Sequence, residues 1–420
     1  MFVMNWQYRI YPSLVQEARM VSWLEICRGV YNYALAERKD WIQSRKCPID
    51  RCSLEKSYII PADAPYPDYY KQQNAVTVAK KKFPHLRDVQ SQVLQEPIRR
   101  VEAAFAARKE RGFGFPRFKK FGQYRSFLFP QFKTNPVRGN KIKLPKIGEM
   151  PIVLHRPIPD GFVVKTVRVI KKHSGWYATL CLQIDVSVPE VPPVLGHAIG
   201  IDVGLEYFLS TSDGLQVERP RFFAKLQRKL KLLQRRLKRK QKGSNNRAKL
   251  IKKIGRVHEQ IAASRLDWQF KQAHKLCRLA SNIFIEDIDF RIMAKGFLGK
   301  HTLDAGLGQF LNQVLPWVCF KTGTYLGKVD PNGTSQECPD CGAIVKKDLR
   351  VRVHECHECG SVKPRDIASS EVIKARGLSG IENVCGVEVA GIWETISSQL
   401  AEKQKSSEAT LRSPRLIAQR

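Results

Sequence analysis

Four cysteines in the C-terminal third of the chain have the spacing of a metal site. Cys338 and Cys341 form one C-x-x-C pair, and Cys356 and Cys359 form a second after fourteen intervening residues. Each pair can direct two sulfurs at one point, and four thiolates make a closed tetrahedral site for Zn²⁺. Chance pairs or disulfides are the alternative, but nothing else in the chain indicates secretion. The spacing therefore predicts a structural zinc ribbon, since a closed site has no open position for a substrate.

The stretch between the two cysteine pairs alternates apolar and charged side chains. Residues 343–354 end in the run LRVRVH. An alternation with a period of two is typical of β-strands. We therefore expect a short hairpin between the two pairs, with Gly342 and Gly360 following the two metal-binding turns.

Three acidic residues form a second candidate constellation. Asp202 falls in the middle of an apolar strand, Glu286 ends a later apolar strand, and Asp366 lies in the first turn of a helix that follows Pro364. An aspartate inside an apolar strand is costly unless it is compensated. It is either a satisfied buried hydrogen-bonding group or a metal ligand. Two-metal phosphodiester hydrolysis requires carboxylates that converge on a pair of Mg²⁺ ions.

The elements that must position these acids have a recognisable order. A strand, a hairpin turn at Asp213-Gly214 and further strands are predicted over residues 197–219, and another strand over 281–290. A helix starting near Asp366 completes the series. This is the order of an RNase H-like fold, and it places the ribbon beside the acids. The sequence thus predicts an α+β nuclease core with Asp202, Glu286 and Asp366 as catalytic Mg²⁺ ligands.

The net charge identifies the class of partner. Lys and Arg total 72 against 39 Asp and Glu, a net charge of +33 over 420 residues. Such an excess opposes folding by self-repulsion and indicates an anionic partner, first of all nucleic acid. A membrane is the rival, but the chain has no run of 18 apolar residues and no signal peptide. Seven cysteines are scattered singly, which indicates reduced thiols in a cytosol.

Two basic stretches are candidates for nucleic-acid contact. Residues 221–256 hold 16 Lys or Arg and no acid, with leucines at helical spacing and a break at 242–246. Sixteen like charges repel one another unless phosphates neutralise them. In residues 111–133, Phe and Tyr alternate with Lys and Arg, so the rings either stack on unpaired bases or form the core of a hairpin. The candidate contacts are Arg117, Lys119, Lys120, Arg228, Lys229, Arg235, Arg236, Lys238, Arg239 and Lys240.

The remaining patterns predict an N-terminal half of mixed structure. A strand is expected over residues 1–10 and helices over 13–40 and 86–110, separated by a loop or insertion over 45–72. Short alternating runs over 141–188 predict a small antiparallel β-domain, interpreted as a barrel. A second basic helix is expected to run to about Ala280, and another helix over 301–323.

The motifs GIDVG (200–204), FIEDI (284–288), TSQECPDCG (334–342) and HECHECG (354–360) resemble those of the TnpB proteins. These are transposon-encoded RNA-guided DNA nucleases related to type V CRISPR effectors. YRIYPS and GFPRFKK in the N-terminal part fit as well, so the resemblance covers most of the chain. It implies a guide RNA made from the transposon end, a double-stranded DNA target beside a short motif, two Mg²⁺ ions held by the three acids, and a prokaryotic cytoplasmic protein that works at the nucleoid rather than at a membrane.

The resemblance also implies a division into domains. It assigns a wedge-type β-barrel to residues 1–12 and 111–195, a helical recognition domain to 13–110, a RuvC-like nuclease domain to 196–330 and 361–380, the zinc ribbon to 331–360, and a poorly ordered tail to 381–420. The guide sequence, the flanking motif and the oligomeric state are outside what the sequence predicts.

The sequence departs from the family at the last acid. TnpB proteins usually carry D-R-D-x-N-A there, whereas this chain has Pro364 in place of the first Asp and Ala368 in place of the Asn. Losing a group that orients a metal ligand often costs 10- to 100-fold in activity. Two alternatives therefore remain beside the guided nuclease: an RNA-guided DNA binder that represses with weak or lost cleavage, and an RNase H-like transposase that needs no RNA.

Overall fold

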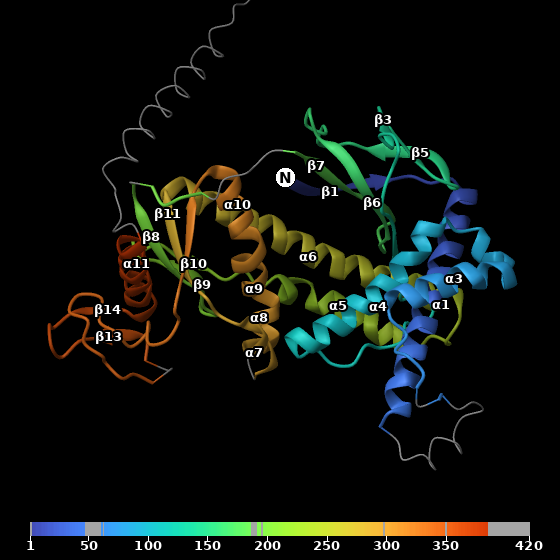
Figure 1. Ribbon diagram of the computed structural model, residues 1–420. Coiled ribbons are helices and arrows are strands. Elements are labelled where there is room, and N and C mark those ends of the chain that lie inside the picture. The colour runs from blue at the N-terminus through green and yellow to red at the C-terminus, as the bar shows by residue number, and fades with distance from the viewer. Residues whose placement is uncertain are drawn as a thin grey trace, which may run out of the picture. The chain divides into compact units, whose positions relative to one another are not determined.

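The structure is a computed structural model of the chain and describes residues 2–46, 60–61, 63–185, 191–194, 196–296, 299–348 and 351–384. Half of the predicted insertion at 45–72 and most of the predicted tail at 381–420 lie outside the described residues. The chain divides into two compact units, Met1–Pro189 and Glu190–Arg420. Figure 1 shows the elements of each unit.

A seven-stranded antiparallel sheet forms the first unit's β-layer, in the order β2-β6-β7-β1-β5-β4-β3. β1 lies between β5 and β7, with Arg9 opposite both Val153 and Tyr177. β2 and β3 remain as unpaired edges, so the predicted barrel is an open half-barrel sheet. The strands are β1 (Phe2–Ile10), β2 (Ser126–Phe129), β3 (Val137–Arg138), β4 (Lys141–Leu144), β5 (Gly148–Val153), β6 (Val163–Lys171) and β7 (Trp176–Ile184).

Helices pack on one side of this sheet (Figure 1). Ser13 caps the first helix in a reciprocal capping box, in which its hydroxyl accepts from the Gln16 N–H and its own N–H donates to the Gln16 side chain. Trp23 from this helix packs against Phe127 and Phe129 of β2, at ring distances of 5.6 and 6.1 Å. The helices are α1 (Leu14–Ser44), α3 (Tyr69–Lys82), the 3₁₀ turn η1 (Pro84–Arg87) and α4 (Ser91–Arg111).

A five-stranded mixed sheet is the centre of the second unit, in the order β10-β9-β8-β11-β12. β9 pairs antiparallel with β8 and β10, whereas β11 runs parallel to both β8 and β12. The hairpin and the acid-tipped strand are therefore present as predicted. The strands are β8 (Ala198–Asp202), β9 (Tyr207–Thr211), β10 (Gln216–Glu218), β11 (Asn282–Glu286) and β12 (Tyr325–Val329).

Two long helices follow the hairpin and pack against each other. α5 (Phe222–Lys238) and α6 (Asn245–Leu279) are separated by the predicted break. Leu230 and Leu233 of α5 meet Val257 and Ile261 of α6 in a small apolar cluster. The far end of α6 packs on α10 and contributes Ala273 and Leu276 to the main core of this unit.

The segment after β11 is helical in pieces rather than as one helix. It comprises α7 (Phe290–Lys295), α8 (Gly299–Ala305), α9 (Leu307–Gln309), a π-helical turn, η2 (Phe310–Val314), and α10 (Leu315–Thr322). Gly306 has φ +70°, and Pro316 lies at the start of α10. Both residues interrupt a regular helix, which explains the breaks within the predicted span 301–323. No helix in the described part of the chain is long and apolar enough to cross a membrane.

Candidate functional site

Asp202 and Glu286 lie at the same edge of the second sheet. Asp202 is the last residue of β8, and Glu286 is the last residue of β11. The two strands are parallel neighbours, and their last matched pair is Ile201 with Ile285. The two acids are therefore the next residues on adjacent strands, at the carboxyl ends where parallel sheets present their functional groups.

The final helix, α11 (Arg365–Val384), brings Asp366 to these strands. Two glycines permit its close approach: a Cβ on Gly200 of β8 would come within 2.0 Å of the Ser370 carbonyl oxygen, and a Cβ on Gly377 would come within 2.2 Å of the Phe284 ring. Figure 1 shows α11 beside β8. Because Asp366 lies in the first turn of this helix, close packing of the helix on the sheet delivers it to the same edge.

The pKa of Asp202 is consistent with this arrangement of the three acids. Burial raises the pKa of Asp202 to about 8, and the negative charges of Glu286 and Asp366 add to the rise. Arg365 and the Val203 N–H lower it, but less strongly. Glu286 and Asp366 are thus close enough to Asp202 to disfavour its negative charge, and the site gains by taking up a proton or a cation.

Each of the other two acids has its own fixed contacts. Burial raises the pKa of Glu286, while a hydrogen bond from the Thr334 hydroxyl and the charge of Arg376 lower it. Asp366 accepts from the Arg365 guanidinium, at 3.4 Å from Nε and 3.3 Å from Nη2, and its side chain is 16% exposed. These contacts restrict the orientations of both carboxylates.

The donor chemistry fits a hard divalent cation such as Mg²⁺, which prefers carboxylate oxygen. Carboxylates on three separate elements can be shared between two such ions.

Asp202 differs from the sequence prediction in its place on the strand. It was expected in the middle of an apolar strand, but it ends β8 and is partly exposed, after four fully buried residues. Pairing with β11 stops at Ile201, so the chain leaves the sheet just where the charge appears. Part of the residue stays exposed at the strand end, but its carboxyl group is enclosed closely enough for burial to raise its pKa.

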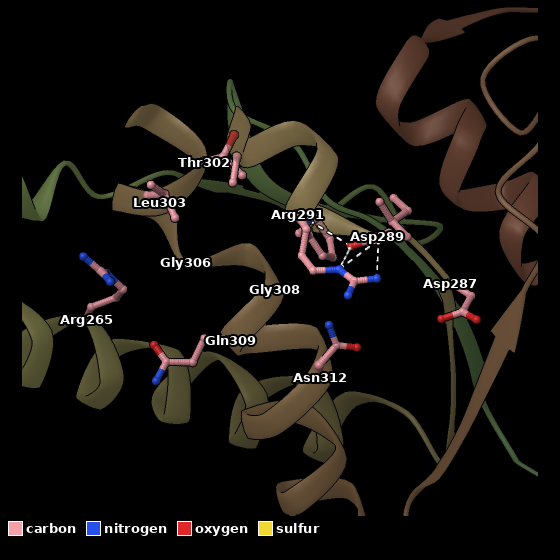
Figure 2. Close-up of a pocket in the computed structure, with 13 residues that line it drawn as sticks. Arg265, Asp287, Asp289, Arg291, Thr302, Leu303, Gly306, Gly308, Gln309 and Asn312 are labelled. Atoms are coloured by element: carbon pink, nitrogen blue, oxygen red, sulfur yellow. Dashed lines mark hydrogen bonds and ion pairs between the residues drawn. The ribbon is translucent and has the colours of Figure 1, made fainter. Parts of the chain in front are cut away.

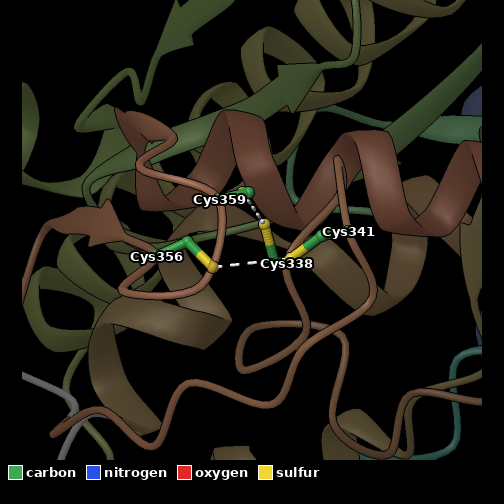
Figure 3. Close-up of side chains that lie close together, drawn as sticks. All are labelled: Cys338, Cys341, Cys356 and Cys359. Carbon is green, nitrogen blue, oxygen red and sulfur yellow. Dashed lines mark hydrogen bonds between the residues drawn. The ribbon is translucent and has the colours of Figure 1, made fainter.

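The four cysteines converge from two turns (Figure 3). The Sγ atoms of Cys338 and Cys359 are 3.6 Å apart, those of Cys341 and Cys356 are 3.5 Å apart, and all four lie within 4.8 Å of one another. Tetrahedral Zn²⁺ with Zn–S bonds of about 2.3 Å separates its sulfurs by about 3.8 Å. A disulfide would need about 2.05 Å. The cluster therefore has the size of a four-thiolate metal site.

The two cysteine turns have the same backbone design. The Gly342 N–H donates to the Cys338 carbonyl and the Gly360 N–H to the Cys356 carbonyl, both at 2.9 Å. Both glycines have positive φ, +76° and +74°, which a residue with a side chain rarely adopts. Each turn therefore folds back at a glycine and points its two sulfurs inward.

The predicted hairpin between the cysteine pairs is wrong in position. The strands are β13 (Val353–Glu355) and β14 (Val362–Pro364), which pair antiparallel and enclose the second cysteine pair. Residues 343–348 form only a bridge from Ile344 back to Glu337. The metal-binding turn itself is the hairpin turn, so the alternating run 351–355 pairs with residues after it rather than before it.

The basic face of α5 is solvent-exposed. All seven cations predicted there are exposed, and among the described residues none forms an ion pair with a carboxylate. The leucines on the opposite side fill the seam with α6. This arrangement leaves an unneutralised positive surface for phosphate. Its members are Arg228, Lys229, Arg235, Arg236, Lys238, Arg239 and Lys240.

In the aromatic and basic segment at 111–133, some rings are exposed and available for stacking on bases, and others form part of the core. Phe127 and Phe129 are buried in the core of the first unit, on a strand that pairs with β6 rather than in a local hairpin. Phe113, Phe118 and Phe121 are 48%, 45% and 80% exposed. Among the predicted cations in this segment, Arg117 and Lys120 are exposed and Lys119 is partly buried. Residues 113–121 therefore supply exposed rings and cations, and residues 126–129 supply core.

A cavity of about 670 Å³ lies just beyond the end of β11 (Figure 2). Asp287, Gln309 and Asn312 line it, together with Asp289 and Arg291, which form a bidentate ion pair at 2.7–3.0 Å. None of the three predicted acids lines this cavity. The candidate site is therefore an open edge of the sheet rather than the cavity.

Three residues that contact the acids were not singled out from the sequence. Thr334, Arg365 and Arg376 touch Glu286 or Asp366, or influence the pKa of one of the acids. Thr334 lies in the TSQ run before the first cysteine pair. This run contributed to the family resemblance, but the sequence indicated no role for Thr334. Arg376 had no signal, because its partners lie about 40 residues earlier in the chain.

Comparisons with known families agree with this architecture. Residues 180–296 match the OrfB_IS605 family, described as a probable transposase, and residues 309–373 match the Cas12f1-like TNB domain. Residues 4–47 match a helix-turn-helix domain of the OrfB_IS605 type. In this structure those residues form β1 and the single uninterrupted helix α1 over their described part. These matches define the class: a protein that resembles the OrfB_IS605 type and carries a Cas12f1-like TNB domain.

Curated relatives specify the family. The chain is 30% identical over 358 residues to a protein of Escherichia coli K12 provisionally named RNA-guided DNA endonuclease InsQ, covering 81% of this chain and 84% of that protein. It is also 30% identical over 419 residues to a provisionally named RNA-guided DNA endonuclease of Streptomyces pristinaespiralis, covering 98% of each. The chain belongs to the TnpB family.

A solved structure shows the same fold at low sequence identity. Cas12f1, determined by cryo-electron microscopy with its guide RNA and target DNA, matches with a TM-score of 0.50 and 14% identity, covering 86% of this chain and 82% of that chain. At this identity the likeness concerns the fold alone. It supports an α+β multidomain architecture for the chain.

Proposed function

We propose that this protein is an RNA-guided, Mg²⁺-dependent DNA endonuclease of a transposable element. One observation carries the proposal: Asp202, Glu286 and Asp366 come from three separate elements, and Glu286 and Asp366 lie close enough to Asp202 to add to the rise in its pKa that burial causes. Structural ion pairs contain opposite charges, whereas functional sites often hold like charges together. The relatives' names supply the RNA-guided class of reaction.

The strand order supports an RNase H-like, RuvC-type nuclease domain. A hairpin sheet is extended by two parallel strands and covered by α11, with acids at the ends of β8 and β11 and at the start of the helix. We assign this domain to residues 196–330 and 361–380, with the ribbon at 331–360. We assign the wedge-type β-domain to 1–12 and 111–195 and the helical recognition domain to 13–110.

The three carboxylates would hold the metal. Bound Mg²⁺ supplies Lewis-acid chemistry, lowering the pKa of water for attack on the DNA phosphodiester and stabilising the leaving oxygen. Asp202 would give up its proton when the cation binds, because the cation would offset the burial and the neighbouring negative charges that raise the pKa of Asp202. Arg365 holds the Asp366 carboxylate in one orientation through its two contacts.

The four cysteines would hold a structural Zn²⁺. Support comes from the spacing of the sulfurs and from the two matching glycine turns. The sulfur site is closed, so its role is to fold the segment that lies between β12 and α11. In this way the ion would fix the chain on both sides of the acid edge.

The exposed cations would hold the nucleic acids. The unpaired positive face of α5 suits the phosphates of a guide RNA or of the heteroduplex, where backbone contacts fix position while base pairing supplies sequence. The exposed rings at 113–121 suit stacking on unpaired bases. A prokaryotic cytoplasm, close to the nucleoid, is the compartment that these partners require.

A second candidate function is an RNA-guided DNA binder with weak or lost cleavage. Ala368 is 2% exposed and offers only a methyl group where the family carries an amide, and Pro364 is taken up in β14. The three acids are nevertheless retained, which favours cleavage. An RNA-independent transposase is the third candidate, and bound RNA would exclude it.

The direct test is to purify the protein from its native locus and sequence any bound RNA. The complex is then incubated with a plasmid that matches the RNA, in Mg²⁺ and in EDTA. We expect RNA from the transposon end and cleavage that EDTA abolishes. RNA with tight binding but no cut would select the repressor, and a protein without RNA would contradict guided action.

A further inference from the structure

A short turn connects β12 to the first cysteine pair and reaches back to Glu286. The Thr334 hydroxyl donates to Glu286 Oε1, and the Thr334 residue is only 4% exposed. The Pro331 carbonyl oxygen lies 3.2 Å from the same hydroxyl. A hydroxyl has one proton to donate, and a carboxylate is a stronger acceptor than a carbonyl. The hydroxyl is therefore committed to Glu286.

The turn that carries Thr334 is held by its own backbone. The N–H groups of Gln336 and Glu337 both donate to the Gly333 carbonyl, at 2.9 and 3.0 Å. Gly333 has φ +77°, so only glycine turns the chain here without strain. The Asp330 carboxylate accepts from the Asn332 N–H at 3.0 Å. Thr334 thus sits in a compact turn whose shape does not depend on Glu286.

Arg376 fastens this turn to α11. Its Nη1 donates to the carbonyls of Asp330 and Asn332, at 3.0 and 2.8 Å. Its Nε and Nη2 donate to the carboxylate of Glu337, at 3.1 and 2.6 Å. Four contacts from one planar guanidinium specify both position and orientation. The helix that carries Asp366 therefore also fixes the turn that carries Thr334.

We propose that Thr334 is a positioning residue for Glu286, and that Arg376 holds Thr334 in place. A glutamate at a strand end has three side-chain torsions, and a single directed hydrogen bond selects among them. The oxygen that does not accept from Thr334 is then presented toward the acid edge. This inference rests on the proposed function, since it assigns Glu286 to the binding of the catalytic cation.

The consequence is a link between the four-cysteine module and the acid edge. Glu337, whose carboxylate accepts from Arg376, immediately precedes Cys338. A change in the folding of the module would pass through this turn to Thr334 and then to Glu286. The contacts needed for this link are all present in one unit of the chain.

The test compares Thr334→Val, which keeps the shape and removes the hydroxyl, with Thr334→Ser, which keeps the hydroxyl. Thr322→Val is the control for the loss of a threonine hydroxyl, since the hydroxyl of the exposed residue Thr322 donates to the Val318 carbonyl at 2.9 Å. Each variant is studied as the full ribonucleoprotein. The readouts are Mn²⁺ affinity by electron paramagnetic resonance, the Mg²⁺ concentration for half-maximal cutting, guided DNA binding and the melting temperature.

We expect Thr334→Val to weaken Mn²⁺ binding, and to raise the half-saturating Mg²⁺ concentration, by about 10- to 100-fold. Guided DNA binding should stay unchanged, Thr334→Ser should restore both metal readouts, and Thr322→Val should match the wild type. If Thr334→Val does not fold, Arg376→Met tests the same link and should weaken Mn²⁺ binding with Thr334 intact. In a folded double variant the two effects should be less than additive.

Unchanged Mn²⁺ affinity in both Thr334→Val and Arg376→Met would overturn the inference. An equal loss in Thr334→Ser or in Thr322→Val would also overturn it, because the hydroxyl would then not be the cause. A wild-type complex that binds Mn²⁺ with this dependence on Thr334 but never cuts would leave the positioning role intact and refute the nuclease proposal instead. A wild-type complex that binds no Mn²⁺ would refute both.

Discussion

The surroundings of Asp202 disfavour its negative charge. Its carboxyl group is largely removed from water, and the negative charges of Glu286 on the sheet edge and Asp366 on α11 outweigh the positive charge of Arg365. Without a cation this arrangement favours the protonated acid, which has a folded-state pKa of about 8 against an ordinary value of 3.8. The site is therefore built for a positive ligand and is strained without one.

The effect of the Asp202 charge on folding stability can be measured in the metal-free protein. A raised folded-state pKa contributes stability that is complete below the unfolded value of 3.8 and is lost as the pH rises through about 8. Asp202→Asn removes the charge, so the variant should not lose stability as the pH rises through this range. In EDTA we expect Asp202→Asn to melt several degrees above the wild type at pH 9, with the difference shrinking toward pH 4.

Asp267→Asn is the control for this experiment, since Asp267 is an exposed acid paired with Lys271 at 2.8 Å on the surface of α6. It should not stabilise the protein at pH 9. A destabilised Asp202→Asn at pH 9 in EDTA would show that the carboxylate is compensated by its surroundings, and that the three acids do not repel as described.

The sequence singles out the three acids but not their contacts. Asp202 and Glu286 stand out because charge interrupts or ends an apolar run, and Asp366 stands out because it lies in the first turn of a predicted helix after Pro364. The contact of Glu286 is not local, since Thr334 is 48 residues away, and Arg376, which holds the turn that carries Thr334, is 39 residues from its partner Glu337. Such partners depend on how strands and helices pack, and no spacing rule along one chain reveals them.

At the scale of elements, the four-cysteine module is the clearest case of local design. Its two turns repeat the same hydrogen bonds and the same positive-φ glycine. The module has little apolar core of its own, since Ile344, Val353 and Val362 are 63%, 42% and 65% exposed. A small module without a core depends on its metal for folding.

We therefore expect Cys338→Ser to release zinc and to lower the melting temperature. Cys181→Ser is the matched control, because Cys181 is a partly buried single thiol on β7 outside the module. Zinc content by atomic emission should fall by about one ion per chain in the first variant and stay unchanged in the second. Full zinc content in a folded and active Cys338→Ser protein would refute the metal site.

The α5 surface makes a prediction about salt. The triple variant Arg235→Ala, Arg236→Ala and Lys238→Ala removes three unpaired cations, so the slope of log K against log salt for guide RNA should fall by about 2 to 3. Filter binding over a salt series measures this slope. Affinity at low salt should fall with it.

A second triple variant controls for net charge. Lys141→Ala, Lys271→Ala and Arg291→Ala also remove three positive charges, but each of these cations is paired with a neighbouring acid. Their loss should change the slope much less. Equal slopes for the two triple variants would show that overall charge, and not the α5 face, holds the RNA.

Elements with a strong periodic pattern were predicted, and weakly patterned ones were missed. α1, α5, α6 and β11 agree with the sequence to within a few residues. α3 was missed because it buries little, with Gln72 its only fully buried residue. β12 was missed because glycine is uncommon in strands and one of its five residues is Gly327. A Cβ at this position would lie 2.7 Å from the Phe284 ring, so the packing of Phe284 requires glycine here. In both cases the neighbouring elements, and not the segment itself, determine the structure.

At the scale of the molecule, the sequence predicts the class of fold but not whether the sheet of the first unit closes into a barrel. The order of strands and acids in the second unit, and the antiparallel sheet in the first, were both expected. The sheet is a half-barrel rather than a full barrel, because the edge strands β2 and β3 each pair on one side only among the described strands and do not pair with each other. Closure depends on the curvature and register of the whole sheet, which alternation within one strand does not encode.

The measurement that tests the account most directly compares cutting and binding in the same preparation. Wild-type and Asp202→Ala complexes, each with its bound RNA, are given a matched plasmid in Mg²⁺, and cleavage and DNA affinity are measured side by side. We predict that the wild type cuts and that Asp202→Ala binds equally well without cutting. Equal loss of binding and cutting in Asp202→Ala, or cutting that persists without this carboxylate, would contradict the assignment of the acid edge as the nuclease site.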